Sequence, residues 1–239
     1  MISTLLSRGL AAVCFLVLAA CTAQPQLQRA GVFDRPDTLF DPARAIQQGW
    51  IEMPLVGHTD YRIASSQDRL SIRAQGQRSA SGLVLPVDFD AELCPYLEWD
   101  WRVEELQESA SLFEKDLEDV AASIFVMFGD PGSFAAPRAV PTLRYVWTTG
   151  RVPEETIVDS PYLPGVVRSI VVQGGIVSPL AWESEKRDLV ADFQAAFGKL
   201  PPDRVQAIAI FTDNDQTQEP VVAHYGAARL LCAATDNPS

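Results

Sequence analysis

The chain has 239 residues, 31 acidic against 19 basic side chains, and a formal net charge of −12. A charge of this sign repels nucleic acid and anionic membrane surfaces, so neither is a favourable partner. Hydrophobic residues make up 47% of the sequence, which is enough for a sizeable core, and the length suits one large β-sandwich.

The N-terminus has the features of an exported lipoprotein. One basic residue, Arg8, precedes an apolar run at residues 9–20 that is too short to span a bilayer as a mature helix. The run ends in Leu18-Ala-Ala-Cys21, which resembles the lipobox of lipoprotein precursors. We therefore expect residues 1–20 to be a signal peptide and Cys21 to carry the lipid that attaches the protein to the membrane. A conventional signal peptide followed by a chance cysteine is the alternative.

Behind Cys21 the sequence predicts a tether and then one folded domain. Residues 22–29 are polar and without periodicity, so they cannot bury apolar surface. We expect a lipidated tether over residues 21–31 and a single domain over residues 32–233. Thr22, the residue after the lipidated cysteine, is compatible with sorting to the outer membrane, with the domain facing the periplasm.

The cysteines are consistent with an oxidising compartment. Cys14 leaves with the signal peptide and Cys21 is acylated, so Cys94 and Cys232 are the thiols left in the mature chain. Cys94 precedes one expected strand and Cys232 ends another, so the ends of two sheet strands are expected to meet. We predict a disulfide between them.

Short runs rich in β-branched and aromatic residues recur along the chain, with turn residues between them. The clearest is at residues 97–103, where apolar and polar side chains alternate strictly and place Trp99 and Trp101 on the core face. This density of runs predicts an all-β sandwich or barrel. The other expected strands are at residues 61–64, 70–74, 82–87, 123–128, 142–148, 166–172, 207–212 and 222–231.

One segment has the pattern of an α-helix. Asp188 is placed to cap its N-terminus, and Gly198 with two following prolines ends it. We expect this helix to pack across one end of the sandwich. Residues 129–141 hold three prolines and two glycines and predict a long surface loop. The apolar residues that recur at helical spacing are Leu189, Phe193, Ala196 and Phe197.

The common catalytic signatures are absent from the sequence. It has no Gly-x-Ser-x-Gly elbow, no His-Glu-x-x-His, no phosphate-binding Walker loop and no Gly-x-Gly-x-x-Gly, and no cofactor is predicted. His224 lies in an expected strand, where a structural or surface role is the better interpretation than a catalytic one. A carboxylate pair for glycoside cleavage requires a separation that sequence cannot supply. The acids from which it would be drawn are Asp100, Asp119, Glu183, Asp188, Asp213 and Asp215.

Asp213-Asn-Asp215 places two carboxylates at alternate positions directly after an expected strand. This spacing lets a loop wrap around a calcium ion. The EF-hand pattern is not met, because Gln218 and His224 stand where it needs glycine and glutamate. No metal is predicted beyond this weak calcium option, and a turn held by side-chain hydrogen bonds is the equal alternative.

Trp147 and Trp182 are expected at strand ends with half-exposed rings. Aromatic rings beside carboxylates and arginines suit a glycan, because the ring covers C–H surface while the polar groups bond hydroxyls. We predict that the charged run after Trp182 and the Asp213 turn converge on one polar site, with Arg187 as counter-charge. A structural ion pair that pins the helix to the sandwich is the alternative. The candidate ligand-binding residues are Asp119, Trp147, Trp182, Arg187, Asp188, Asp213 and Asp215.

Several of these segments resemble, in their order, the bacterial family called domain of unknown function 3047. The resemblance covers most of residues 33–231 and implies an exported β-sandwich, similar in outline to jelly-roll carbohydrate-binding modules, with no established activity. After Asp119, where the family tends to an arginine, this chain has Ala121-Ala-Ser123, so a ligand site that uses the arginine differs here. The matching segments are Leu97-x-Trp99-x-Trp101-x-Val103, Lys115-Asp-x-Glu-Asp119, Tyr145-Val-Trp147, Trp182 to Gly198, and Ala207 to Gly226.

The sequence therefore predicts a jelly-roll-like β-sandwich, anchored by lipid, that binds a glycan or another envelope component without catalysis. One alternative is a polysaccharide lyase or glycoside hydrolase on the same fold, which requires a cluster of perturbed acids in a cleft. Another is a structural or assembly lipoprotein with a protein partner, which requires a large exposed apolar patch.

Overall fold

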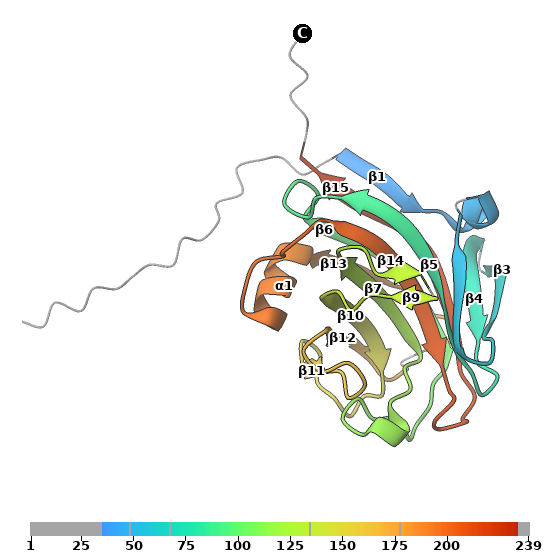
Figure 1. Cartoon of the computed structure of the whole chain (residues 1–239). Helices are drawn as coiled ribbons and strands as arrows, with labels where there is room; N and C mark the ends of the chain where they lie inside the picture. The colour runs from blue at the N-terminus through green and yellow to red at the C-terminus, as the bar shows by residue number, and fades with distance from the viewer. Residues whose placement is uncertain (1–34, 48, 67, 134, 177, 234–239) are drawn as a thin grey trace, which may run out of the picture. The chain divides into compact units, whose positions relative to one another are not determined.

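The computed structural model describes residues 35–47, 49–66, 68–133, 135–176 and 178–233. These residues form a jelly-roll-like β-sandwich of two large sheets, with one α-helix and two short 3-10 helices (Figure 1). The expected signal peptide, Cys21 and most of the tether lie outside the described residues. Among the described helices, none has both the length and the apolar character needed to cross a membrane.

Sheet A has six strands in the order β13-β6-β15-β4-β3, with β1 paired to β15 as well. All of its neighbouring strands are antiparallel. The strands are β1 (Arg35–Phe40), β3 (Asp60–Ser66), β4 (Arg69–Gln75), β6 (Tyr96–Glu105), β13 (Glu183–Asp188) and β15 (Val222–Cys232).

Sheet B has seven strands in the order β11-β12-β10-β7-β14-β5-β2. One pair, β10 with β12, is parallel. The strands are β2 (Ile51–Val56), β5 (Ala80–Phe89), β7 (Ala122–Phe128), β10 (Thr142–Thr148), β11 (Ile157–Asp159), β12 (Val167–Gly174) and β14 (Val205–Asp213).

The two sheets enclose an aromatic core. Trp99 and Trp101 of β6 are at most 2% exposed, which confirms that the alternating face of this strand is buried. Trp99 contacts Tyr145 with ring centroids 5.2 Å apart, and Trp101 contacts Trp147 at 5.6 Å. Because the two partners belong to β10 of sheet B, these pairs join the layers and fix how the sheets face each other.

The sandwich has two ends that matter for the site. At the near end β1 begins, β15 stops and β6 starts, since Arg35 pairs with Cys232 and Tyr96 pairs with Leu231. At the far end lie the last residues of β4, β6 and β14 and the turn that leads into β15, where the Gly76 amide donates to the Val221 carbonyl.

A disulfide and the α-helix close the near end. Cys94 and Cys232 are bonded to each other, as the cysteine analysis predicts. Helix α1 (Leu189–Phe197) starts where expected, because the Asp188 carboxylate accepts the Val190 and Ala191 amides. Its apolar face is buried, with Phe193 against Phe128 at 4.6 Å between centroids. The 3-10 helices are η1 (Pro42–Gln47) and η2 (Lys115–Leu117).

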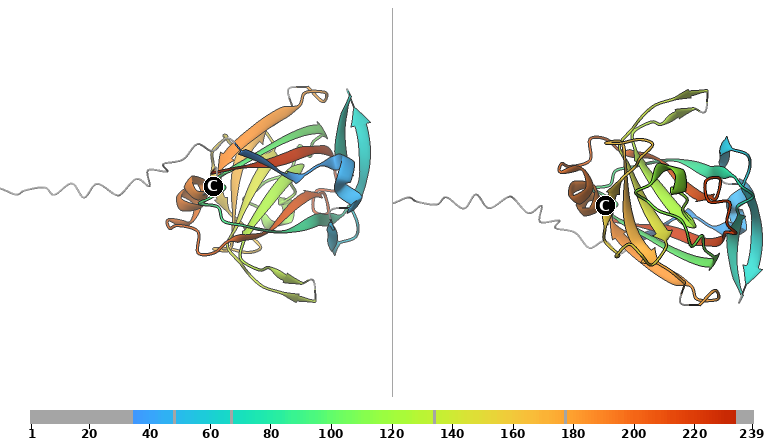
Figure 2. Two further views of the ribbon diagram at one scale, coloured as in Figure 1. Left: turned by 90° about the horizontal axis from the view of Figure 1, so that it is seen from above. Right: turned by 90° about the horizontal axis from the view of Figure 1, so that it is seen from below.

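Every strand expected from the sequence is present, and the structure adds several that were not expected. The loop expected at residues 129–141 contains a small hairpin, β8 (Gly132–Ser133) with β9 (Ala136–Pro137), so that prediction is corrected. Figure 2 shows the hairpin standing out from the body of the sandwich. The other additions are β1, β2, β11 and β13.

Candidate ligand-binding site

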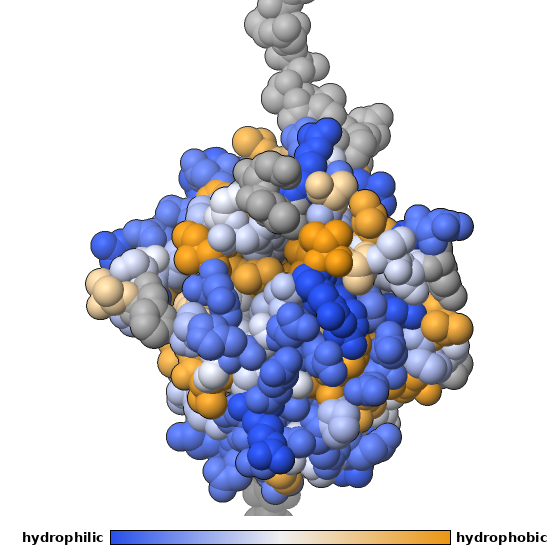
Figure 3. Space-filling model, turned by 90° about the vertical axis from the view of Figure 1, so that its right-hand side faces the viewer, coloured by the Kyte–Doolittle hydropathy of each residue, from blue (hydrophilic) through white to orange (hydrophobic). Residues whose placement is uncertain are grey.

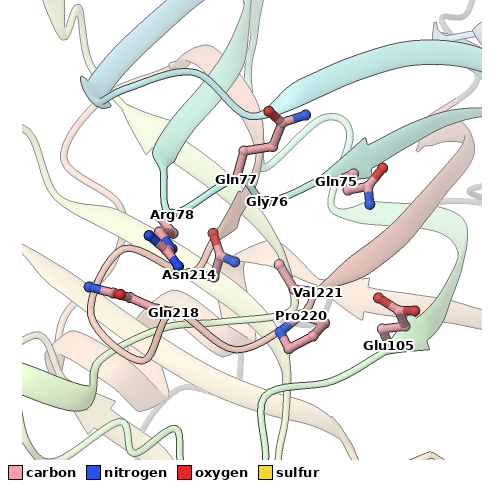
Figure 4. A pocket seen from close by; sticks show the side chains of 9 residues that line it. All are labelled: Gln75, Gly76, Gln77, Arg78, Glu105, Asn214, Gln218, Pro220 and Val221. Carbon is pink, nitrogen blue, oxygen red and sulfur yellow. The ribbon is translucent and has the colours of Figure 1, made fainter.

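A pocket of about 370 Å³ lies at the far end of the sandwich (Figure 4). Three segments build it: the loop after β4, the end of β6 and the turn between β14 and β15. Its volume is at the lower end of the range of small-molecule sites, about 300–1,000 Å³. The lining residues are Gln75, Gly76, Gln77, Arg78, Glu105, Asn214, Gln218, Pro220 and Val221.

The wall of the pocket is rigid. The buried Asn214 amide accepts the Ser79 N–H through Oδ1 and donates to the Glu219 carbonyl through Nδ2. Gly76 packs so closely that a Cβ there would lie 2.5 Å from atoms of Asn214 and Val221. A side chain at this position therefore cannot fit without moving the wall, and the pocket shape depends on glycine.

The mouth of the pocket carries polar side chains with spare bonding capacity. Gln77, Arg78 and Gln218 make no side-chain hydrogen bond to another described residue, whereas the Gln75 amide oxygen accepts from Arg73 Nη1 at 3.0 Å. A carboxamide both donates and accepts, as a sugar hydroxyl does. These groups suit a hydroxyl-rich ligand.

Two of the lining residues hold an unusual backbone conformation. Arg78 has φ 56° and Gln218 has φ 60°, in the left-handed region that favours glycine. For residues with a Cβ this conformation costs about 1–2 kcal/mol. Such strain persists where the surrounding structure enforces it, and it concentrates at ligand sites.

The predicted acids Asp119, Asp213 and Asp215 do come together, directly beside the pocket wall. Their carboxylate oxygens lie within 4.8 Å of one another. Asp119 accepts the Thr217 amide at 2.6 Å and the Gln216 amide at 3.3 Å, while Asp213 accepts the Val120 amide at 2.8 Å. These hydrogen bonds connect residues 118–120 to residues 213–217.

Proton binding in this cluster is perturbed. Burial raises the pKa of Asp213 well above its ordinary value, and the carboxylates of Asp119 and Glu118 raise it further. Burial and Asp119 also raise the pKa of Asp215. Both effects arise because one more negative charge is unfavourable in a buried, already acidic cluster. These oxygens are of the kind calcium prefers, but backbone amides already bond Asp119 and Asp213, so the weak calcium option remains a prediction.

The remaining predicted site residues are placed elsewhere, and the single convergent site is wrong. Arg187 bonds Asp192 at 2.9 Å and Glu155 at 2.6 Å, not Asp213. In the register of sheet A, Arg187 lies opposite Leu97, near the start of β6. The backbone carbonyl of Asp213 instead accepts from the side chain of Gln107, which lies beyond the last residue of β6. The two groups are therefore associated with opposite ends of β6 and do not meet.

The other residues of the charged run are also corrected. Asp188 caps helix α1. Trp147 is 5% exposed, and its indole N–H donates to the Gly175 carbonyl at 2.7 Å, so it belongs to the core and offers no ring to a ligand. Trp182 is half-buried on the outer face of sheet A. Its partial exposure agrees with the prediction, but its ring lies away from the acid cluster.

His224 lies in a buried polar row and not in a catalytic site. Its Nδ1 is 3.1 Å from the Ser71 hydroxyl, and its Nε2 is 3.1 Å from Glu104. This order of groups resembles a hydrolase triad, but Ser71 is 0% exposed and cannot reach a substrate. The structural interpretation of this histidine therefore fits the geometry.

The sequence analysis does not identify the residues that line the pocket. Gln77, Arg78 and Gln218 form no motif, and they are brought together by a turn and a loop that are far apart in the chain. The one usable signal is the compact turn Asp213-Asn-Asp215, because it predicts an ordered loop in the right place.

Comparison with known proteins identifies the family of this chain and several solved structures with a similar outline. Curated proteins include no match to this sequence. A family 11 carbohydrate-binding module of a Clostridium thermocellum cellulase is 11% identical, with a TM-score of 0.42, over 83% of this chain and 95% of that chain. A metagenome-derived family 12 endoglucanase is 12% identical, with a TM-score of 0.42, over 83% of this chain and 99% of that chain.

A family 11 xylanase from Neocallimastix patriciarum is similar at 12% identity and a TM-score of 0.37, over 85% of this chain and 98% of that chain. Likenesses at this level concern the outline of the sandwich and not its surface. The family model described as "Protein of unknown function (DUF3047)" matches residues 48–229, and the chain belongs to that family.

Proposed function

We propose that this protein is an envelope lipoprotein that binds a glycan at the far-end pocket without catalysing a reaction. The observation that carries the proposal is a set of polar side chains at the pocket mouth that make no side-chain hydrogen bond to another described residue. They are Gln77, Arg78 and Gln218, beside a wall held by the hydrogen bonds of Asn214. The hydroxyl groups of a glycan need hydrogen-bond partners when the ligand is bound. These side chains can supply donors and acceptors without breaking a side-chain hydrogen bond to another described residue.

The position of the pocket supports a role at the membrane. Residue 35, where the described chain begins, lies at the near end, and the pocket lies at the other end of β15. The eleven residues of this strand span roughly 35 Å. The described chain therefore begins at the end of the sandwich opposite the pocket, which is compatible with attachment of a lipid to Cys21.

The absence of catalysis is supported by the acids of the site. Glycoside cleavage uses two carboxylates on either side of the bond. Glu105 is the one carboxylate among the described residues that line the pocket. The neighbouring acid cluster is perturbed, as an enzyme would require, but Asp119 and Asp213 are buried and occupied by backbone amides.

A role in binding a protein partner has less support. Apolar side chains of β2, β3 and β4 are exposed, among them Ile51, Leu55 and Leu70. Figure 3 shows the side of the molecule that carries β3 and β4, where hydrophobic atoms form separate spots among hydrophilic ones. The protein-partner alternative requires a large exposed apolar patch, and this face does not present one as a continuous area.

The test is binding of the detergent-solubilised mature lipoprotein to soluble polysaccharides, neutral and acidic, by affinity electrophoresis and calorimetry. Replacing Gln77 and Gln218 together by Ala removes two bonding groups and is expected to weaken binding roughly tenfold. Gln194→Ala, an exposed glutamine on helix α1, is the matched control. Unchanged affinity in the double variant, or no binding to any polysaccharide, contradicts the proposal.

A further inference from the structure

A row of basic side chains crosses the outer face of sheet A. Strand register places Arg62 opposite Arg73, Arg73 opposite His224, and His224 opposite Arg102. Directly opposed residues share a face of the sheet, and three inter-strand spacings make the row about 14 Å long. Trp182 continues it, since the next residue, Glu183, pairs with Trp101. We call these five residues the basic row: Arg62, Arg73, His224, Arg102 and Trp182.

This arrangement is unfavourable for folding alone. Arg62 and Arg73 are like charges directly opposite each other, which is destabilising in a sheet. His224 adds no comparable charge, because burial lowers its pKa and Arg102 Nη2 lies 2.7 Å from its Nε2. The chain has far more acidic than basic residues from which to build pairs. Glu104 lies 3.1 Å from Arg102, and Asp60 lies 3.9 Å from Arg62. The side-chain hydrogen bond of Arg73 goes to a neutral group, Gln75, and among the described residues no acidic side chain forms an ion pair with it.

The row also contains donors that lack acceptors. Arg102 is 2% exposed, and its Nε and Nη1 have no hydrogen-bond partner among the described residues. The indole N–H of Trp182 is likewise buried without an acceptor in the described part of the chain. A buried donor left unsatisfied costs free energy. Each of these orphan groups is a donor. Because the atoms are covered, they add positive charge beneath the row, and a ligand would contact the more exposed Arg73 and Arg69.

Trp182 is held as a platform above this charge. Its ring centroid is 5.7 Å from the Arg102 guanidinium carbon and 5.6 Å from that of Arg69. Gly226 lies beneath it, where a Cβ would come 3.4 Å from the ring and 3.0 Å from Asp100. The half-buried ring therefore presents its remaining exposed surface beside two guanidinium groups, where the C–H surface and the acidic substituents of one ligand would be bound together.

The basic row is continuous with the far-end pocket. Arg73 donates to Gln75, and Gln75 lines the pocket. The carboxamides of the pocket and the guanidinium groups of the row are therefore close enough to be contacted by one extended ligand.

We propose that the ligand is an acidic polysaccharide whose sugar carboxylates bind along the basic row, with Arg73 and Arg69 as the accessible contacts and Trp182 as the ring platform. This inference rests on the proposed glycan-binding function and names its substrate class. Guanidinium groups match carboxylates in geometry and charge. A bilayer of anionic lipid presents a broad surface that the net charge of −12 repels, whereas a single polymer chain is narrow enough to lie along Arg73 and Arg69, away from Glu104, which already pairs with Arg102.

The test compares acidic polymers with neutral ones of the same backbone. The mature lipoprotein is titrated with polygalacturonate, alginate and hyaluronate, and with the carboxyl-reduced form of each. We expect at least one acidic form to bind roughly tenfold more tightly than its reduced counterpart. In the double variant Arg69→Gln with Arg73→Gln this preference falls to within twofold, and Trp182→Ala weakens both forms. Arg138→Gln, an exposed arginine of the hairpin region, is the control.

The outcomes separate the two proposals. If glycans bind but acidic and reduced forms bind equally, or if the double variant keeps the preference, the substrate class is wrong and the glycan-binding function stands. If no polysaccharide binds, both fail. Tighter binding to vesicles with 30% phosphatidylglycerol than to any acidic polymer overturns the assignment in favour of a lipid surface. Thermal melts confirm that each variant is folded.

Discussion

Asp213 makes the stability of this protein depend on pH in an unusual direction. Its pKa in the folded state is raised by burial and by Asp119 and Glu118, whereas an unfolded aspartate titrates near about 3.9. Between those two pKa values the folded state binds the extra proton. Stability from this group is therefore highest below the unfolded pKa and is lost as the pH rises through the folded pKa.

The size of the effect follows from proton linkage. One extra bound proton gives a slope of at most about 1.4 kcal/mol per pH unit. For a domain of this length that corresponds to roughly 3–6 °C in Tm per pH unit. Replacing Asp213 by Asn removes the titration but keeps an oxygen for the Val120 amide and adds an N–H for the neighbouring carboxylates. We expect the variant to be at least as stable as the parent at pH 8 and close to it at pH 4.

The assay is Tm by circular dichroism from pH 4 to pH 8 for the parent, Asp213→Asn and the control Asp116→Asn, an exposed aspartate of η2. The decisive quantity is the difference between the variant and the parent as a function of pH, because the other titrating groups cancel in it. Parallel curves, or a variant several degrees less stable throughout, would show that the proton on Asp213 plays no part and that its carboxylate acts as a charged structural partner.

The remaining predictions concern the anchor, the core and the pocket. Cys21→Ala is expected to move the protein from the membrane to the soluble fraction, and a variant that stays membrane-bound contradicts lipidation. Non-reducing alkylation and mass spectrometry should find Cys94 and Cys232 blocked, and reduction should lower Tm because the bond closes a long loop, worth about 4–5 kcal/mol in the unfolded chain. Trp147→Ala is expected to cost about 3–5 kcal/mol in urea unfolding, and a loss below 1 kcal/mol is incompatible with its core position. Gly76→Ala should lower the free energy of unfolding by about 1–3 kcal/mol and weaken glycan retention, since its Cβ would overlap Asn214. Unchanged retention would show that the side chains of the pocket wall move aside without affecting binding.

The strands that were predictable are those with one face in the core. In β6, alternation of Trp99 and Trp101 with charged residues reveals both the strand and its buried face. The missed strand β13 reads Glu-Ser-Glu-Lys-Arg-Asp, with no apolar side chain, because it is an edge strand held by backbone bonds to β6. Periodicity has nothing to detect in such a segment.

The site was predictable only where it depends on local chain. The turn after Asp213 is local, since the Gln218 amide donates to the Asn214 carbonyl, and so is the helix cap at Asp188; both are found as expected. The sequence predicts the wrong carboxylate partner for Arg187, because Asp192 is presented by the first turn of the helix, which no strand pattern reveals. The half-exposed ring predicted for Trp147 is wrong because a position at the end of a strand does not determine which face the ring occupies.

The basic row shows why overall composition is a poor guide to local recognition. Its residues are separated by up to 162 positions in the chain, from Arg62 to His224, and only the register of sheet A brings them into line. At physiological ionic strength charges are screened over about 8 Å, so a ligand on this face responds to the arginines near it more than to distant acids. The net charge of −12 therefore disfavours broad anionic surfaces such as duplex nucleic acid or bilayers. The same net charge does not disfavour one acidic polymer chain that lies along the row. For such a ligand, the acidic rest of the protein surface would repel those parts of the polymer that leave the row.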